Sequence, residues 1–372
     1  MNLSEWDTGR VVFVVVVSLL CGCATHRDGQ APAKISPTAG FAKNIGPPAE
    51  PVTSPYWDEP FKPTAAYGSY NSIFRKPDGT LEMWNNTMGE GPRDGLVRFR
   101  AKNPVAWKHP RTLAEHRLID DVFEDDGATP AEKRRYTRPC VTFHPEDGYF
   151  AVAHVCDGYP AKHGSVYPAF LTSADGRRWV YHGRLKGEIE AFMPPGNSRW
   201  ANGRGLFYQP EKPKTLNDAH PLENRFVFFS DQYPAKDCLA LLYSADAKTW
   251  KFYRRNGEIV NLLPTGLQGR GMIFPQVIQA GRHGWFAWLS EAWPPKAIWR
   301  IHSPDGLNWS LFGDEQPEIV KPPDVMIKTL SAWYDDREDL LHSYLAIWEH
   351  VTPKLLNYRL YHATTTRFSL EL

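Results

Sequence analysis

Ser173-Ala174-Asp175-Gly176-Arg177-Arg178-Trp179 is a stretch that recurs along this 372-residue chain. Two clear copies occupy residues 244–250 and 303–309, and two looser copies occupy residues 101–107 and 363–368. Each copy ends in an aromatic residue, and by subtraction the successive ends lie 72, 71, 59 and 59 residues apart. That spacing is long for one turn of a solenoid but suits one four-stranded propeller blade with its loops. The sequence therefore predicts an all-β fold, a five-bladed β-propeller of four-stranded antiparallel blades.

The recurring stretch has the chemistry of a turn that leaves the third strand of a blade. Asp and Gly, or Asn and Pro in the copy at 101–107, favour a tight reversal, and the small residue before them ends a strand. The closing Trp or Phe would begin the fourth strand and pack its ring between blades. The alternative is a set of unrelated hairpins that share Asp-Gly turns.

The composition favours one large β domain. With 42% hydrophobic and 13% aromatic residues the chain can bury a core, and no apolar period of 3.6 residues is sustained. Propeller domains reach this length as a single unit. The net charge of +1 gives no basic face, so we expect no nucleic-acid partner. We also expect a monomer.

The N-terminus has the features of an export signal. Arg10 precedes a ten-residue apolar run, Val11 to Leu20, which is too short to span a membrane and suits a signal peptide. The run ends in Leu20-Cys21-Gly22-Cys23, which resembles the lipobox of bacterial lipoproteins. The resemblance implies that residues 1–22 are removed and that Cys23 is lipidated. Acidic residues before the apolar run leave an ordinary cleaved signal or a misassigned start as alternatives.

The domain boundaries follow from this assignment. Residues 23–55 are rich in Pro, Ala, Gly and Ser and predict a flexible tether, and residues 56–372 form the propeller domain. Acyl chains at Cys23 would tether the protein to a membrane without spanning it. We therefore expect a bacterial cell-envelope protein on the periplasmic or cell-surface side of a membrane.

Two cysteines of the folded part are placed for a disulfide. Cys140 and Cys156 lie symmetrically about the turn Asp147-Gly148, so in an antiparallel hairpin they would face each other. Export to an oxidising compartment permits a bond between them. The alternative is two small buried thiols, which is a common state of cysteine in a large core.

Aligning the blades on their inner strands gives a ring of basic residues. We predict inner strands at residues 71–75, 140–144, 206–209, 272–279 and 327–334. Near their starts lie Asn71, Arg138, Arg204, Arg270 and Lys328. Inner strands crowd around the axis, and like charges so close repel each other unless an anion or acidic side chains neutralise them. Guanidinium groups suit a carboxylate, sulfate or phosphate, so the ring predicts binding of an anionic ligand.

Acidic residues follow the second strand of four blades. They are Asp157, Asp231, Glu291 and Glu349. These loops open on the same face as the starts of the inner strands, so a basic and an acidic ring should meet at one mouth of the propeller. Tyr159, Tyr233 and Trp293 in the same loops would supply flat surfaces for sugar rings. The alternative is that the acids only pair with the arginines and lock adjacent blades.

Sequence motifs for other chemistries are absent. The chain has no nucleophile elbow, no zinc-protease motif, no phosphate loop and no dinucleotide-binding glycine pattern, so we expect no cofactor. The acidic excursion at residues 111–135 could hold a structural calcium ion, and a solvated loop or helix is the alternative.

The turn motifs and the blade count resemble those of the five-bladed glycosidases, the arabinanase and xylosidase group together with the invertase and levansucrase group. The resemblance covers the propeller domain. It implies a glycoside hydrolase with carboxylates at the inner ends of the first three blades. At those positions this chain has Asn71, the run Arg138-Pro139-Cys140, and Arg204 with Glu188 and Glu190 upstream. Arginines on separate blades are also similar to the triad with which sialidases grip a sugar carboxylate.

We therefore expect a lipid-anchored glycoside hydrolase that acts on a polysaccharide or oligosaccharide, anionic (uronate or sulfated) or branched. Such hydrolysis needs one carboxyl group as acid and another as base or nucleophile. The candidates are Asp157, Asp231, Glu291 and Glu190, with Asp58 as a further candidate for the base. The alternative is a carbohydrate-binding propeller lipoprotein without catalytic activity.

Overall fold

The computed structural model describes residues 46–86, 96–107, 135–156, 166–192, 205–231, 237–313, 316–352 and 355–368. This part of the chain is built of strands, with helical structure limited to short 3-10 turns. None of its helices is long and apolar enough to cross a membrane. Cys23 and the segment 111–134 lie outside the described residues, as do Asp157, Tyr159, Arg204 and Tyr233.

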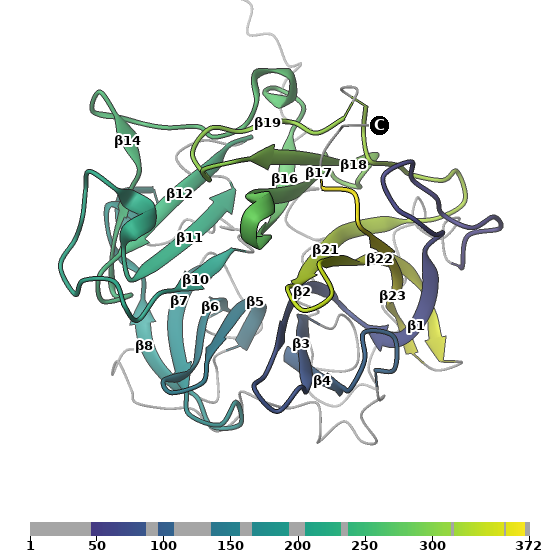
Figure 1. The fold of residues 1–372 in the computed structure, drawn as a ribbon, viewed down its shortest axis with the longest axis horizontal. Coiled ribbons are helices and arrows are strands. Elements are labelled where there is room, and N and C mark those ends of the chain that lie inside the picture. Colours follow the sequence, from purple (N-terminus) through teal and green to yellow (C-terminus); the bar gives the residue numbers. More distant parts are fainter. Residues whose placement is uncertain are drawn as a thin grey trace, which may run out of the picture.

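Five antiparallel sheets are arranged around a central axis, which confirms the predicted five-bladed β-propeller (Figure 1). Blade one contains β2 (Ser69–Arg75), β3 (Leu81–Asn86) and β4 (Leu96–Ala101). Blade two contains β5 (Arg135–His144), β6 (Gly148–Cys156), β7 (Val166–Ser173) and β8 (Val180–Arg184). Blade three contains β10 (Leu206–Tyr208), β11 (Phe226–Asp231), β12 (Leu239–Ser244) and β13 (Thr249–Phe252), with β9 (Lys186–Gly187) added in parallel.

The remaining two blades follow the same plan. Blade four contains β16 (Met272–Gln279), β17 (Trp285–Glu291), β18 (Ala297–Ser303), β19 (Ser310–Leu311) and β20 (Ile319–Val320). Blade five contains β21 (Ile327–Asp335), β22 (Leu340–Thr352), β23 (Leu355–Thr365) and β1 (Lys62–Tyr67). Outside the blades are the hairpin β14 (Arg254–Arg255) and β15 (Glu258–Ile259) and the 3-10 helices η5 (Glu188–Phe192), η6 (Pro221–Glu223), η7 (Thr265–Leu267) and η8 (Gly281–His283).

The recurring turns lie where the sequence predicts them, between the third and fourth strands. In the first copy the Oδ1 atom of Asp175 accepts the backbone N–H groups of Arg177 and Arg178, at 2.7 and 2.9 Å. Asp246 and Asp305 each accept the two equivalent N–H groups of their own turns. The aspartate thus replaces the backbone acceptors that a reversal leaves missing.

The closing aromatic residues pack between blades, as predicted. Trp179 of blade two lies edge-on to Trp84 of blade one, with ring centroids 5.3 Å apart. The contacts of the same kind to the preceding blade are Trp107 on Tyr344, Trp309 on Phe229, and Phe368 on Phe286. These rings fill the wedge between neighbouring sheets and bury large apolar areas there.

Blade five is closed by the two ends of the chain. The N-terminal strand β1 pairs antiparallel with β23 and forms the outermost strand of that blade, beside the C-terminal strand in Figure 1. Residues just before β1 also pack on the blades. Val52, in the stretch predicted as tether, is 4% exposed, and its carbonyl accepts the N–H of Phe61 at 2.9 Å.

The predicted facing of Cys140 and Cys156 is wrong. Cys140 pairs with Val152, and Cys156 pairs with Arg135, because the hairpin turns about Glu146, with His144 paired to Gly148, and not about Asp147-Gly148. The side chains of Cys140 and Cys238 are both buried. The side chain of Cys156 lies outside the described residues.

Candidate functional site

The inner strands are bulged at the end from which each one starts. Their ladders shift register between Ser69 and Ser72, Thr137 and Cys140, Ile273 and Gln276, and Ile327 and Leu330. Bulges redirect side chains and are common beside active sites. The same bulge therefore occurs in four blades at one end of the propeller. We call this end the mouth and take it as the candidate site.

The first residue inside each register shift defines a ring of equivalent positions. These residues are Tyr70, Arg138, Phe274 and Lys328, and we call them the mouth cluster. Tyr70, Arg138 and Phe274 have positive φ values of 61°, 51° and 58°. A positive φ at a residue other than glycine costs of order 1–3 kcal/mol of backbone strain. Such strain persists only where the surrounding structure holds the backbone in place, and this occurs often at functional sites.

This register corrects the predicted ring. Arg138 and Lys328 occupy equivalent positions, but Asn71 lies one residue beyond the position of Tyr70. Arg270 lies before β16, and the equivalent residue of that blade is Phe274. The alignment by charge was therefore out of register in two blades, and the ring contains aromatic residues as well as cations.

The cations of the mouth cluster lie over aromatic rings. The Nζ atom of Lys328 is 4.6 Å from the ring centroids of both Tyr70 and Tyr358. The guanidinium of Arg138 is 5.2 Å from the Tyr70 ring, which also packs edge-on against Phe274 with centroids 5.2 Å apart. Such cation–π contacts are strongest where water is excluded, and Lys328 is only 3% exposed. Two positive charges are thereby held near the axis.

Trp293 extends the cluster toward solvent. Its ring lies edge-on to Phe274, with centroids 5.8 Å apart, and its centroid is 5.8 Å from the Nζ atom of Lys328. The side chain is 38% exposed, one of the few large hydrophobic groups on the described surface. An exposed indole beside a buried lysine offers a flat apolar surface next to a site for negative charge.

Three of the four bulges are held by a polar side chain from the second strand of the preceding blade. Asn86 Oδ1 accepts the backbone N–H of Arg138 at 3.2 Å, and Asp231 Oδ2 accepts that of Phe274 at 2.9 Å. Ser290 Oγ donates to the carbonyl of Lys328 at 2.7 Å. Sequence reasoning missed Ser290, although a polar residue near the end of each second strand was the available signal.

Of the predicted acids, Glu291 is placed at the mouth. Its Oε2 atom accepts the indole N–H of Trp299 at 2.7 Å and lies 4.0 Å from a guanidinium nitrogen of Arg270. That guanidinium in turn lies 4.7 Å from the Trp299 ring centroid. The Glu291 side chain is 22% exposed. Here a basic and an acidic residue meet, as expected of the two rings.

The other described acids each accept hydrogen bonds from partners of their own. Asp231 is fully buried and holds the backbone of the neighbouring bulge. Glu349 is 4% exposed and accepts from Arg359 and from the Tyr361 hydroxyl inside blade five. Glu190 lies on η5 beside the outer strand β13 and accepts the N–H of Gly187, and Asp58 accepts the N–H of Thr366. The structure does not bring these four carboxylates together.

Asn71 is the residue at which the resemblance to the five-bladed glycosidases would place a carboxylate. Its side chain is fully buried, and neither amide atom has a hydrogen bond within the described part of the chain. Its backbone N–H donates to Ser331 Oγ at 3.3 Å. A buried amide in this state has both a donor and an acceptor left to offer.

A narrow channel leads away from the mouth. It has a volume of about 180 Å³ and is lined by residues of all five inner strands, beginning with those that directly follow the bulges, Ser72, Cys140 and Gln276. The mouth cluster therefore lies at one end of the channel, and the hairpin turns of the inner strands lie at the other.

Solved structures with this fold include carbohydrate-active enzymes. A structure described as a glycoside hydrolase matches with a TM-score of 0.53 at 14% identity, over 86% of this chain and 93% of its own. A GH43 β-1,3-galactosidase with galactodeoxynojirimycin matches with a TM-score of 0.53 at 12% identity, over 82% and 94%. An N-acetylgalactosamine deacetylase from F. plautii, in complex with blood group B trisaccharide, matches with a TM-score of 0.52 at 13% identity, over 85% and 95%.

At these identities the likeness establishes the fold. No protein-family model matches the sequence. No curated protein matches it either.

Proposed function

We propose that this protein is a glycoside hydrolase that acts at the mouth on an anionic polysaccharide or oligosaccharide. The observation that carries the proposal is the mouth cluster, where Arg138 and Lys328 are held over aromatic rings beside the exposed Trp293. Sugars stack on indole rings, and a uronate or sulfate group complements two neighbouring cations. The occurrence of the same fold in glycoside hydrolases supports this assignment.

The mouth residues have distinct roles in this reaction. Trp293 forms the platform for a sugar ring, and Arg138 and Lys328 orient its anionic substituent. Glu291 supplies one of the two carboxyl groups that hydrolysis requires, and Asp157 is the candidate for the other from its place after the second strand of blade two. Asp231 holds the Phe274 bulge and thereby positions the site.

A carbohydrate-binding protein without hydrolytic activity is the second candidate. The observation that favours it is Asn71, an uncharged amide at a position that carries a catalytic carboxylate in the enzymes this chain resembles. The cations and the indole platform would serve binding equally well.

We also propose that the chain is anchored through lipidated Cys23 on the outer side of a bacterial membrane. The apolar run that ends at Leu20 and the cysteine after it support this assignment. The anchor would hold the propeller near the surface where polysaccharide arrives.

The decisive experiment is hydrolysis of a panel of neutral, uronate-containing and sulfated glycans by the mature protein. We expect product from an anionic glycan, with a loss of at least 100-fold in Glu291→Gln and in Asp157→Asn, because each variant removes one carboxyl group. Glu223→Gln, an exposed acid on η6, is the matched control and should keep full activity. Binding of an anionic glycan without cleavage would replace the hydrolase by the binding protein.

A further inference from the structure

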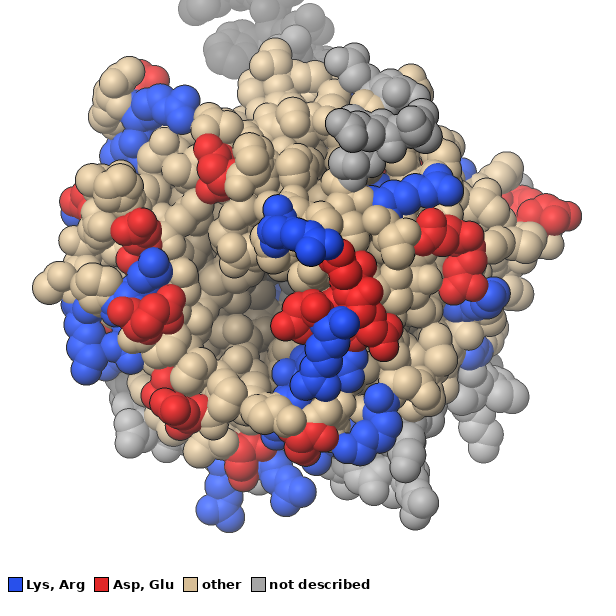
Figure 2. Space-filling view, viewed as in Figure 1, with Lys and Arg blue, Asp and Glu red and all other residues tan. Residues whose placement is uncertain are grey.

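A second group of chemically capable side chains lies at the opposite end of the propeller from the mouth. Asp335 ends the inner strand β21, Glu338 is in the turn that follows, and His342 is the third residue of β22. Acidic and basic side chains gather around this turn beside the central hollow (Figure 2). One carboxylate oxygen of each acid and one imidazole nitrogen all lie within 4.8 Å of one another.

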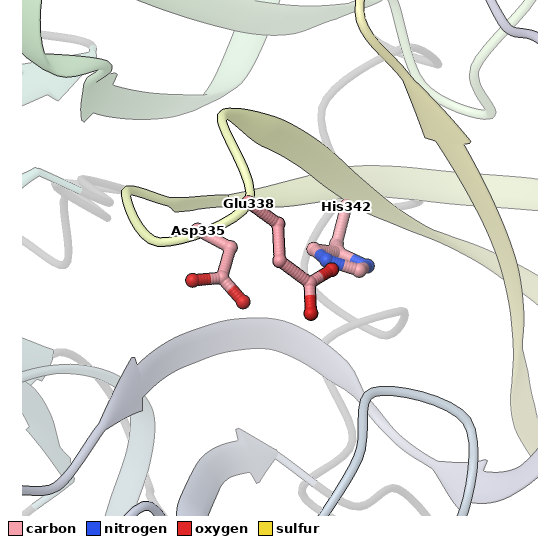
Figure 3. A group of neighbouring side chains, drawn as sticks. All are labelled: Asp335, Glu338 and His342. Carbon is pink, nitrogen blue, oxygen red and sulfur yellow. The ribbon is translucent and has the colours of Figure 1, made fainter.

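The imidazole of His342 is held in a fixed orientation. It is 4% exposed, its ring stacks on Trp333 with centroids 4.9 Å apart, and its Nδ1 atom lies 3.0 Å from Nε2 of His362 on β23. The other nitrogen, Nε2, is buried and has no hydrogen bond within the described part of the chain. Figure 3 shows a ring nitrogen of His342 on the side of Glu338. The imidazole of His342 thus lies beside the carboxylates of Asp335 and Glu338, with one buried nitrogen that has no hydrogen bond in the described part of the chain.

Asp335 is also fixed but keeps capacity for a further ligand. It is 1% exposed, forms an ion pair with Arg75, and accepts the backbone N–H of Arg337 at 3.2 Å through Oδ1. A carboxylate has about four lone-pair positions, so these bonds do not exhaust it. The side chain of Glu338 is exposed, so its rotamer can change to bring the carboxylate onto a bound ion.

We propose that Asp335, Glu338 and His342 form a binding site for a divalent transition-metal ion such as zinc. One imidazole nitrogen with two carboxylate oxygens is a donor set that suits zinc, whereas calcium and magnesium prefer oxygen alone. Zinc lies about 2.0–2.2 Å from such ligands, which places the ligand atoms up to about 4 Å apart. A small rotation of the exposed Glu338 side chain brings the three atoms to that separation.

The surroundings fit such a site. In the tautomer that donates Nδ1–H to His362, the His342 Nε2 lone pair is available to the metal, and this second-shell bond orients the ring. Arg75 is the charged group that already faces Asp335. Two carboxylates and one guanidinium together carry a net charge of −1, which favours a bound cation. Three protein ligands leave a fourth position open toward solvent on the side of Glu338.

The site would fasten the turn at residues 336–339 to the two strands that it connects. It requires no residue of the mouth and no glycan, so it holds or fails independently of the proposed hydrolase function. The competing interpretation is an acidic turn that serves only to neutralise Arg75, with no affinity for metal.

The test is isothermal titration of the metal-free mature protein with Zn²⁺, and with Ca²⁺ in a parallel titration. We expect zinc to bind at this site with at least tenfold preference over calcium. Glu338→Gln should remove at least tenfold of that affinity, because an amide oxygen is a poorer zinc ligand than a carboxylate oxygen. Asp336→Asn, an exposed acid in the same turn that is not in the cluster, should bind zinc as the wild type does.

A second readout separates metal ligation from charge. The Co²⁺-loaded protein should show d–d absorption in the visible that changes in His342→Gln, with thermal unfolding of that variant recorded to confirm that it folds. Should Glu338→Gln and Asp336→Asn weaken zinc binding equally, the acidic turn attracts cations without a defined site and the proposal is wrong. Failure of the wild type to bind zinc would also overturn it.

Discussion

Arg300 and Lys328 are both cations buried among aromatic rings, and the difference between them shows that burial alone does not reveal the role of a charge. Arg300 is 1% exposed and Lys328 is 3% exposed. Arg300 lies over Phe312 at 4.0 Å and near three further rings, and Lys328 lies between Tyr70 and Tyr358. By burial and cation–π contact alone, the two residues are alike.

Their positions in the fold are different. Arg300 is in the middle of β18 and faces a fully buried carboxylate, Glu318, at 2.6 Å. The other oxygen of Glu318 accepts the indole N–H groups of Trp57 and Trp288, at 2.5 and 3.0 Å. The ion pair thus joins blade four to the N-terminal segment that carries Trp57. It is enclosed by protein, and its purpose is structural.

Lys328 is instead on a bulge at the mouth. Its backbone carbonyl is held by Ser290, and its amine faces a ring system that continues to the exposed Trp293. A buried charge therefore does not by itself identify a functional site. The bulge, which redirects the side chain toward the opening, is what distinguishes Lys328.

The largest effect expected is on stability, in Arg300→Met. The substitution leaves Glu318 buried without its counter-ion, and breaking such a pair costs about 3–5 kcal/mol. We expect the free energy of unfolding, measured in urea, to fall by that amount. The double variant Arg300→Met, Glu318→Gln should recover most of the loss. If the single variant and the wild type are equally stable, the ion pair of Arg300 with Glu318 does not stabilise the fold.

Lys328→Met should have the next largest effect, and on binding instead of stability. Methionine fills a similar volume between the two tyrosine rings, so the midpoint of thermal unfolding should stay within a few degrees. Affinity for the anionic glycan should fall at least tenfold, which corresponds to about 1.4 kcal/mol. Lys248→Met, an exposed lysine in a blade-three turn, is the control and should bind normally. A large loss of stability with unchanged affinity would make Lys328 a structural cation like Arg300.

The fold was largely predictable because its signal is local. Asp175, Asp246 and Asp305 form the same side-chain-to-backbone bonds wherever the motif occurs, so the motif alone located the third turn of three blades. The closure of blade five was not predicted. In that blade the outermost place beside β23 is not filled by the strand that follows it in the sequence. The strand β1 takes that place through a pairing between distant segments.

The site was less predictable because its register depends on bulges. Charge led to Arg270, whereas the ladder places Phe274 at the equivalent position. A one-residue bulge transfers a side chain from one face of a strand to the other and leaves no distinct pattern in the sequence. Arg138 and Trp293 were found because their chemistry is conspicuous. Ser290 was not found, because its contribution is a bond to the backbone of another blade.

The turn aspartates provide a third environment for charge, exposed at the surface, where the effect should be smallest. Burial alone would raise the pKa of Asp305, but N–H donors from Leu307 and Asn308 outweigh it and hold the pKa at about 2. The ionised form is therefore favoured in the folded state, and its contribution is complete above pH 3.8 and is lost as the pH falls toward 2. Asp305→Ala should cost about 1 kcal/mol at pH 7, because it removes the acceptor of two backbone N–H groups.

Asp305→Asn keeps an oxygen acceptor without a titrating charge, so it separates the hydrogen bonds from their pH dependence. We expect it to be nearly as stable as the wild type at pH 7. Between pH 5 and 2.5, measured by urea unfolding, it should lose less stability than the wild type, since one of the three turn carboxylates no longer protonates. An identical pH profile for the two proteins would show that the charge of Asp305 contributes nothing to the free energy of unfolding.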